Sequence, residues 1–132
     1  MNRDILFRGK VKLPDNYRGH NLSYRNGDWV YGLMNSNESI RGIFVDTNTI
    51  GQYTGLTDMN GTKIFDGDIL QDVNTGEYVV VQWFPEHSSF MVWRIAINKI
   101  DFLYFFLYPR KLKVVGNVYD GQNLIDKEKE GV

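Results

Sequence analysis

The chain alternates apolar and polar positions in short segments that are separated by turn-forming residues. Alternation is seen over residues 28–34 and 89–95, and residues 77–84 are β-branched or aromatic almost throughout. A period of two places successive side chains on opposite faces of a strand, so each segment predicts a β-strand. Further strands are predicted over residues 40–45, 69–73 and 111–119.

Turn signals join these segments closely. The Asn26-Gly27 pair predicts a tight hairpin turn, because both residue types tolerate positive φ. We expect residues 28–34 and 40–45 to pair with each other. Short connections favour antiparallel strands in a small barrel or sandwich over a parallel sheet. Three more turns are predicted in the part of the chain rich in Gly and Asp, at residues 58–61, 66–68 and 74–76.

Residues 98–108 fit two different elements. The spacing of Ile100, Leu103 and Leu107 allows a short helix, whereas the run 102–108 is compatible with a strand buried on both faces. The aromatic side chains of this run either fill the core or form a surface at which copies of the chain or a partner associate. The candidate association surface consists of Phe102, Tyr104, Phe105, Phe106 and Tyr108.

The overall charge argues against a protein that coats nucleic acid. The 132 residues include 15 Lys and Arg against 16 Asp and Glu, which gives a net charge of -1. The chain has no Cys, which excludes disulfides, a thiolate nucleophile and a zinc–thiolate site and fits a reducing cytoplasm. The sequence shows neither a signal-peptide core nor an apolar run of the roughly 20 residues that span a bilayer, so we expect a soluble, cytoplasmic protein with no membrane partner.

Charge is nevertheless segregated along the chain. Residues 1–25 carry six cationic and two acidic side chains, and residues 58–77 carry one cationic and five acidic ones. Three interpretations stay open: the basic region contacts nucleic acid with help from nearby aromatic residues, it meets the acidic region of another copy, or both are ordinary solvated surfaces. The candidate nucleic-acid contacts are Arg3, Arg8, Lys10 and Lys12.

The sequence does not match the catalytic, calcium-binding or phosphate-binding motifs that would indicate an enzyme. His20 and His87 lie in predicted loops, and no Gly-x-Ser-x-Gly elbow accompanies them. Asp58, Asp66 and Asp68 do not have the spacing of a calcium loop, and the glycines do not form a phosphate-binding loop. We therefore predict no catalytic residue, no metal site and no cofactor, and expect the Asp side chains to bond nearby backbone amides in turns.

Three segments resemble the YopX-like family of phage and prophage proteins. They are the opening Asp4–Arg8, the central block Thr49–Leu70 and the C-terminal block Val114–Tyr119, which is followed by Leu124 and Ile125. In the central block the glycines, Gln52 and the Asp-Gly-Asp turn match the family in order and spacing. The resemblance implies a phage or prophage origin, an SH3-like barrel in the C-terminal part and a short helical turn before the last strand. It implies no activity, because no catalytic residues are established for the family.

The combined prediction is a mainly β protein, an SH3-like small barrel with an additional N-terminal β portion and at most short helical turns. We expect residues 1–48 to form the N-terminal β portion, 49–120 the barrel and 121–132 a polar C-terminal tail. A candidate groove, suggested by the position of the residues on turns, consists of Gln52, Tyr53 and Asn117.

The predicted function is a non-enzymatic binding or assembly module that works in the cytoplasm of a bacterial host. We expect it to form a homo-oligomer, with a phage or host protein as a further partner. The first alternative is a nucleic-acid-binding protein that uses the basic N-terminal region, and the second is an enzyme of unknown type.

Overall fold

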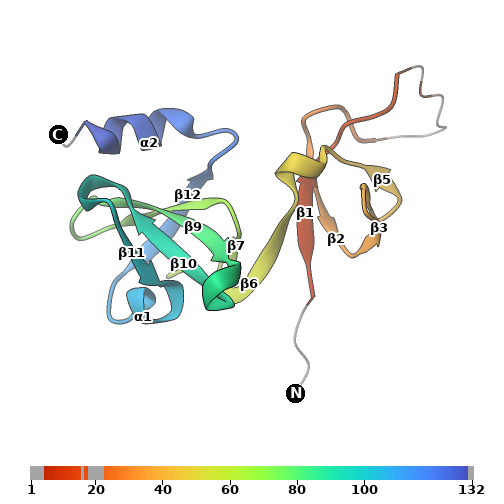
Figure 1. Ribbon diagram of the computed structural model, residues 1–132. Coiled ribbons are helices and arrows are strands. Elements are labelled where there is room, and N and C mark those ends of the chain that lie inside the picture. Colours follow the sequence, from red (N-terminus) through yellow and green to blue (C-terminus); the bar gives the residue numbers. More distant parts are fainter. Residues whose placement is uncertain (1–4, 16, 18–22, 131–132) are drawn as a thin grey trace. The chain divides into compact units, whose positions relative to one another are not determined.

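The computed structural model describes residues 5–15, 17 and 23–130 of the chain (Figure 1). It is mainly β-structure with only short helices, as predicted. The strand pairs whose register is defined are antiparallel, which also confirms the prediction from the short connections. The chain forms two compact units, of which the first ends at Tyr53 and the second begins at Thr54.

The first unit contains two small sheets. In one, β1 lies between β2 and β6, and in the other β4 lies between β3 and β5. Its core is built from Val11, Val30, Ile40 and Val45, all at most 5% exposed. The elements are β1 Phe7–Lys10, β2 Trp29–Gly32, β3 Met34–Ser36, β4 Ser39–Ile40, β5 Ile43–Phe44 and a 3-10 helix Thr47–Thr49.

The pairing predicted for residues 28–34 and 40–45 is only partly observed. β2 pairs with β1 along its whole length, with Trp29 opposite Lys10, and the second segment instead pairs with β3. Arg41 and Gly42 have φ angles of 52° and 78°, so they form a turn that divides the predicted strand into β4 and β5. A break of this kind replaces one long strand by a compact three-stranded meander.

The strand β6 (Gly51–Thr57) belongs to both units. Its first residues, Gly51 and Gln52, pair with β1. Further along, the Thr54 hydroxyl donates a hydrogen bond of 2.8 Å to the backbone oxygen of Ile64 in β7. The part of the chain that resembles the family signature therefore begins in the first unit and continues into the second.

The second unit is organised around a five-stranded sheet. The strand order is β11-β10-β9-β8-β12, and the sheet curls as a half-barrel (Figure 1). The elements are β7 Lys63–Phe65, β8 Asp68–Asp72, β9 Tyr78–Phe84, a 3-10 helix Pro85–His87, β10 Ser89–Arg94, a 3-10 helix Ile95–Ile97, β11 Lys99–Phe102, α1 Leu103–Leu107, β12 Leu112–Asn117 and α2 Gln122–Lys129.

The middle strand of this sheet is buried on both faces. Along β9, Val79 and Val81 pack with Leu103 of α1, whereas Val80 between them packs with Ile125 of α2. Figure 1 shows α1 and α2 on opposite sides of the curled sheet. A strand that is apolar on both faces needs a cover on each, and α2 supplies the second one.

The C-terminal region differs in this respect from the polar tail that we expected. Residues 122–129 form a helix in which Ile125 is 5% exposed. The Glu128 carboxylate accepts a hydrogen bond of 3.0 Å from the backbone nitrogen of Tyr78, which fixes the helix to β9. Within the described residues, no helix is long and apolar enough to cross a membrane.

The Asp residues of the central block and of the hairpin that follows it organise turns, as predicted. The Asp58 carboxylate accepts hydrogen bonds of 2.8 and 2.9 Å from the backbone nitrogens of Asn60 and Thr62. Gly61, at φ 80°, closes this turn in the left-handed region, where residues other than glycine are strained. Asp72 likewise accepts a hydrogen bond of 2.8 Å from the backbone nitrogen of Asn74 in the next hairpin.

Candidate functional site

Four aromatic side chains stand exposed where β11 passes into α1. Phe102 is 42% exposed, Tyr104 56%, Phe105 72% and Tyr108 69%. We call these four residues the aromatic surface. Isolated apolar residues are common at protein surfaces, but a contiguous group of large ones marks an interaction site.

The four rings contact one another. The Phe102 and Phe105 ring centroids are 6.3 Å apart with planes at 88°, and Tyr104 lies 5.5 Å from Phe105 and 5.7 Å from Tyr108. These edge-to-face and tilted arrangements fall within the favourable range for aromatic pairs. His87, from the connection between β9 and β10, extends the series, with its ring 5.8 Å from that of Phe102. The aromatic surface is therefore preformed.

The helical geometry of α1 explains which aromatic residues are exposed. Leu103 and Phe106, three positions apart, lie on the face of the helix that packs against the sheet, and both are at most 2% exposed. Tyr104 and Phe105 consequently point away from it. Phe106 thus differs from the expectation that grouped it with the surface, because it belongs to the core. The helical alternative for this segment rested on Ile100, Leu103 and Leu107 and did not separate Phe106 from the other aromatic residues.

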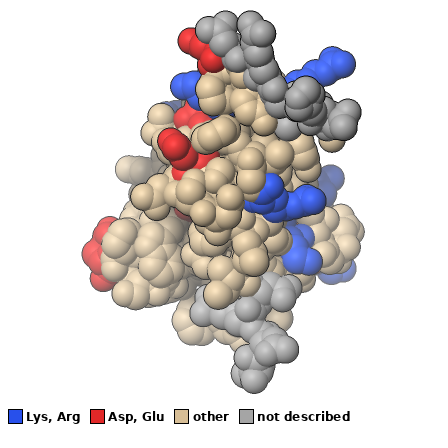
Figure 2. All heavy atoms as spheres, turned by 90° about the vertical axis from the view of Figure 1, so that its right-hand side faces the viewer, with Lys and Arg blue, Asp and Glu red and all other residues tan. Residues whose placement is uncertain are grey.

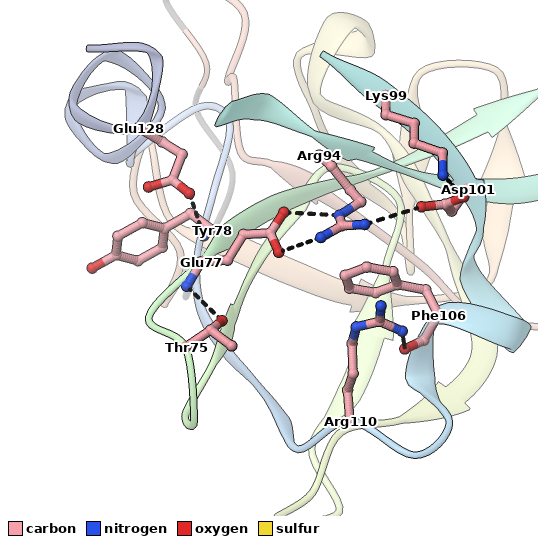
Figure 3. Close-up of polar contacts among 9 residues, drawn as sticks. All are labelled: Thr75, Glu77, Tyr78, Arg94, Lys99, Asp101, Phe106, Arg110 and Glu128. Atoms are coloured by element: carbon pink, nitrogen blue, oxygen red, sulfur yellow. Dashed lines mark hydrogen bonds and ion pairs between the residues drawn. The ribbon is translucent and has the colours of Figure 1, made fainter. Parts of the chain in front are cut away.

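Two arginines hold Phe106 in place (Figure 3). The Arg94 Cζ lies 5.3 Å and the Arg110 Cζ 4.1 Å from the centroid of the Phe106 ring. Arg110 also donates a hydrogen bond of 3.2 Å to the Phe106 backbone oxygen. Cation–π contacts of this kind stabilise a buried ring. Together they anchor α1, and with it the aromatic surface, to the sheet.

Arg94 is itself fixed by acidic partners. Its Nε and Nη2 each donate a hydrogen bond of 2.9 Å to the Glu77 carboxylate, and its Nη1 lies 3.8 Å from an Asp101 oxygen (Figure 3). The hydrogen bond to Glu77 raises the pKa of Arg94. Lys99 Nζ lies 3.8 Å from the other Asp101 oxygen. No motif in the sequence indicates this network, because β9, β10 and β11 must pair before its members meet.

The predicted nucleic-acid contacts do not form one exposed set. Arg3 lies outside the described residues. Arg8 is only 5% exposed, and its Cζ lies 4.8 Å from the centroid of the Trp29 ring, while Lys10 Nζ lies 5.6 Å from the same ring. Alternate residues of β1 share one face, so both cations are directed to the tryptophan of the neighbouring strand.

Lys12 is exposed, but its surroundings are acidic. It lines a shallow hollow to which Asp15, Glu38 and Asp46 also contribute. Figure 2 shows the Lys and Arg side chains of the face drawn there in several separate groups among uncharged atoms, mainly on the right, with Asp and Glu mainly on the left. Cationic groups that are separated by uncharged atoms do not provide the continuous basic track that a nucleic-acid backbone requires.

The three candidate groove residues are distributed over both units. Gln52 and Tyr53 lie in the first, where Tyr53 is 8% exposed, and Asn117 lies in the second. The Asn117 side-chain oxygen accepts hydrogen bonds of 3.0 Å from the backbone nitrogens of Tyr119 and Asp120. Asn117 therefore stabilises the turn between β12 and α2.

Acidic and histidine side chains are spread out in the second unit. Among the residues that the structure describes, no group of three or more His, Asp or Glu side chains is placed to hold a metal ion. The Asp58, Asp68 and Asp72 carboxylates each accept hydrogen bonds from backbone nitrogens. Within the described part of this unit, the aromatic surface combines large exposed rings with contacts between those rings.

A family model described as YopX protein matches residues 6–126 of the chain. A search of curated proteins found no match. The matched residues include the whole central block, β11, α1 and most of α2.

Proposed function

Since the chain belongs to the YopX family, we propose that it is a non-enzymatic binding and assembly module that associates with further copies of itself through the aromatic surface. The observation that carries this proposal is the exposure of four mutually contacting aromatic side chains, from 42% to 72%, on one strand end and one short helix. We further propose a phage or prophage origin and action in the cytoplasm of the bacterial host.

Burial of these rings supplies a driving force for association. Complete burial of a fully exposed large apolar side chain is worth about 1.5–3 kcal/mol, and each of these rings, 42% to 72% exposed, can contribute the corresponding fraction. Aromatic residues are also enriched in the buried centres of interfaces. The cost of ordering them is low here, because α1 is already held by Leu103, Phe106 and the two arginines. Preformed aromatic anchors are typical of the residues that dominate binding energy.

The observed charges favour assembly over nucleic-acid binding. Arg8 is buried, Lys10 shares the Trp29 ring with it, and Lys12 has acidic neighbours. Binding to a nucleic acid through these residues would require them to leave these contacts. The aromatic surface needs no such rearrangement.

Sedimentation velocity over a range of protein concentrations, at 0.1 and 1 M NaCl, tests the proposal. We expect oligomers at both salt concentrations, because contacts between apolar rings are not screened by ions. The variant in which Tyr104 and Phe105 are both replaced by Ser should sediment as a monomer at concentrations at which the wild type is associated.

The matched control is Tyr31→Ser, which removes an aromatic side chain of similar exposure, 45%, from β2 in the first unit. It should leave the oligomer unchanged. A wild-type protein that is monomeric at every concentration, or a double Ser variant that associates as strongly as the wild type, would contradict the proposal.

A further inference from the structure

The two outer strands of the five-stranded sheet, β12 and β11, differ in how their outer edges are protected from pairing with a further strand. Along β12 the register shifts between Val114 and Gly116, and the turn after β6 covers part of the outer edge. In that turn, the Met59 nitrogen donates a hydrogen bond of 2.9 Å to the Leu112 oxygen. An irregular, hydrogen-bonded edge of this kind does not accept another strand.

The edge at β11 has neither a register shift nor a turn that covers it. Its pairing with β10 is continuous, from Lys99 opposite Arg94 to Phe102 opposite Met91. β11 is the last strand of the sheet order, so among the described residues no strand lies beyond it. Ile100, in its middle, is 45% exposed. A regular edge strand with exposed apolar side chains is a template for a further strand.

From these observations we infer that two copies of the chain join their β11 strands edge to edge, antiparallel, with Ile100 on the two-fold axis. The inference rests on the proposed self-association and specifies its geometry. A two-fold interface brings the same surface of both copies together, so the strand must be complementary to its own reverse. The sequence Lys99-Ile100-Asp101 has this property.

Charge selects this register over its neighbours. With Ile100 opposite Ile100 of the other copy, each Lys99 faces Asp101 of the other copy, which gives two pairs of opposite charge. Centring the pair on Lys99 would oppose two cations, and centring it on Asp101 would oppose two carboxylates. Like charges directly opposite each other destabilise a sheet. Lys99 Nζ lies 3.8 Å from the Asp101 carboxylate of its own chain. This contact is compatible with a further one to Asp101 of the other copy.

The same register brings Phe102, the first residue of the aromatic surface, into the interface. It places Phe102 of one copy opposite Asn98 of the other, next to Ile97, which is 56% exposed. The end of β11, where the aromatic surface starts, then lies close to this isoleucine. The edge-to-edge pairing of β11 therefore covers exposed isoleucine side chains together with the start of the aromatic surface.

Cross-linking tests the register directly, because the native chain has no Cys. Residues that face each other across an antiparallel pair have Cα atoms roughly 4.5–5.5 Å apart, a separation that a disulfide bridges. Ile100→Cys should therefore form a covalent dimer under mild oxidation. The control is Val73→Cys, a β-branched side chain of similar exposure, 41%, next to β8 and three strands away. It should remain uncross-linked.

A charge exchange provides a second, independent measurement. Lys99→Glu opposes two carboxylates in each pair, and Asp101→Lys opposes two amines, so each variant alone should associate about tenfold more weakly than wild type. A mixture of the two variants restores opposite charges at both contacts, and it should form one-to-one dimers with close to wild-type affinity. Circular dichroism of each variant verifies its fold.

The outcomes separate the two proposals. If the wild type is oligomeric but Ile100→Cys cross-links no better than Val73→Cys and the mixture shows no gain, the β11 register is wrong and self-association stands. If the wild type is monomeric throughout, both proposals fail. Efficient cross-linking at position 100 together with recovery in the mixture supports the register.

Discussion

Arg8 in the first unit and Phe105 in the second reverse the usual places of charged and aromatic side chains. Arg8 is 5% exposed and lies over the Trp29 ring, whereas Phe105, on the short helix α1, is 72% exposed. Hydrophobicity alone would assign these residues the other way round. The first unit uses a cation in its interior, and the second presents aromatic rings to other molecules.

This contrast follows from what each side chain can contact. A guanidinium is planar and weakly hydrated, so an aromatic ring can replace part of its hydration when it is buried. On α1 the face towards the sheet is already filled by Leu103 and Phe106, and the intervening Phe105 has no room there. The exposure of an aromatic residue is therefore decided by the helical phase, which makes the comparison testable.

The largest effect should come from truncating the buried ring next to Phe105. Phe106→Ala removes a ring that is 2% exposed and is held between Arg94 and Arg110. We expect a loss of about 3–5 kcal/mol in the free energy of unfolding of the second unit. Hydrogen exchange of the β9 amides measures this loss. Normal protection in the variant would show that α1 is not part of the core.

How much of this arrangement the sequence predicts depends on how local the signal is. Turns such as Asp58–Gly61 depend on residues that are neighbours in the sequence, so the Asp and Gly residue types were enough to predict them correctly. The division of residues 40–45 into two strands depends on Arg41 adopting a positive φ, which its residue type does not announce. The helix α2 forms because it covers Val80, a requirement that becomes visible only once the sheet is assembled.

The candidate site shows the same limit. The sequence located the aromatic residues, yet separating Phe106 from Phe105 required knowing that the segment is helical. The pairing of Arg94 with Glu77, 17 positions away, requires the β9–β10 hairpin. Burial of Arg8 depends on Trp29 arriving on the neighbouring strand, so the excess of positive charge in residues 1–25 overstated the basic surface.

A moderate effect is expected from the buried cation. Arg8→Met keeps most of the apolar stem but removes the guanidinium over Trp29, and we expect a loss of about 2 kcal/mol in the stability of the first unit. Protection of the Val30 amide from hydrogen exchange reports it. If Arg8 instead served as an exposed nucleic-acid contact, stability would be unchanged and binding to single-stranded DNA at low salt would fall.

A smaller loss should follow from Glu77→Gln, which tests whether the second unit also uses a cation structurally. The substitution weakens the two hydrogen bonds from Arg94, and we expect a cost of about 1 kcal/mol because both side chains remain partly exposed. Glu77 raises the pKa of Arg94. A group whose pKa is raised by folding stabilises the folded form, and this stabilisation is fully present below the ordinary pKa of arginine and is lost only above it. Chemical denaturation at pH 7 and at pH 9 should therefore show the same contribution of Arg94 to the free energy of unfolding.

The smallest change in the free energy of unfolding should come from Phe105→Ser. The largest is expected at the adjacent residue, Phe106. The Phe105 ring is 72% exposed, so its removal leaves no cavity, and we expect the unfolding free energy to change by less than about 0.5 kcal/mol. Association should nevertheless weaken, because the ring contacts both Phe102 and Tyr104 at the centre of the aromatic surface. Denaturant unfolding and sedimentation of the same sample separate the two effects. A loss of stability comparable with that of Phe106→Ala would mean that Phe105 belongs to the core, and the contrast with Arg8 would then disappear.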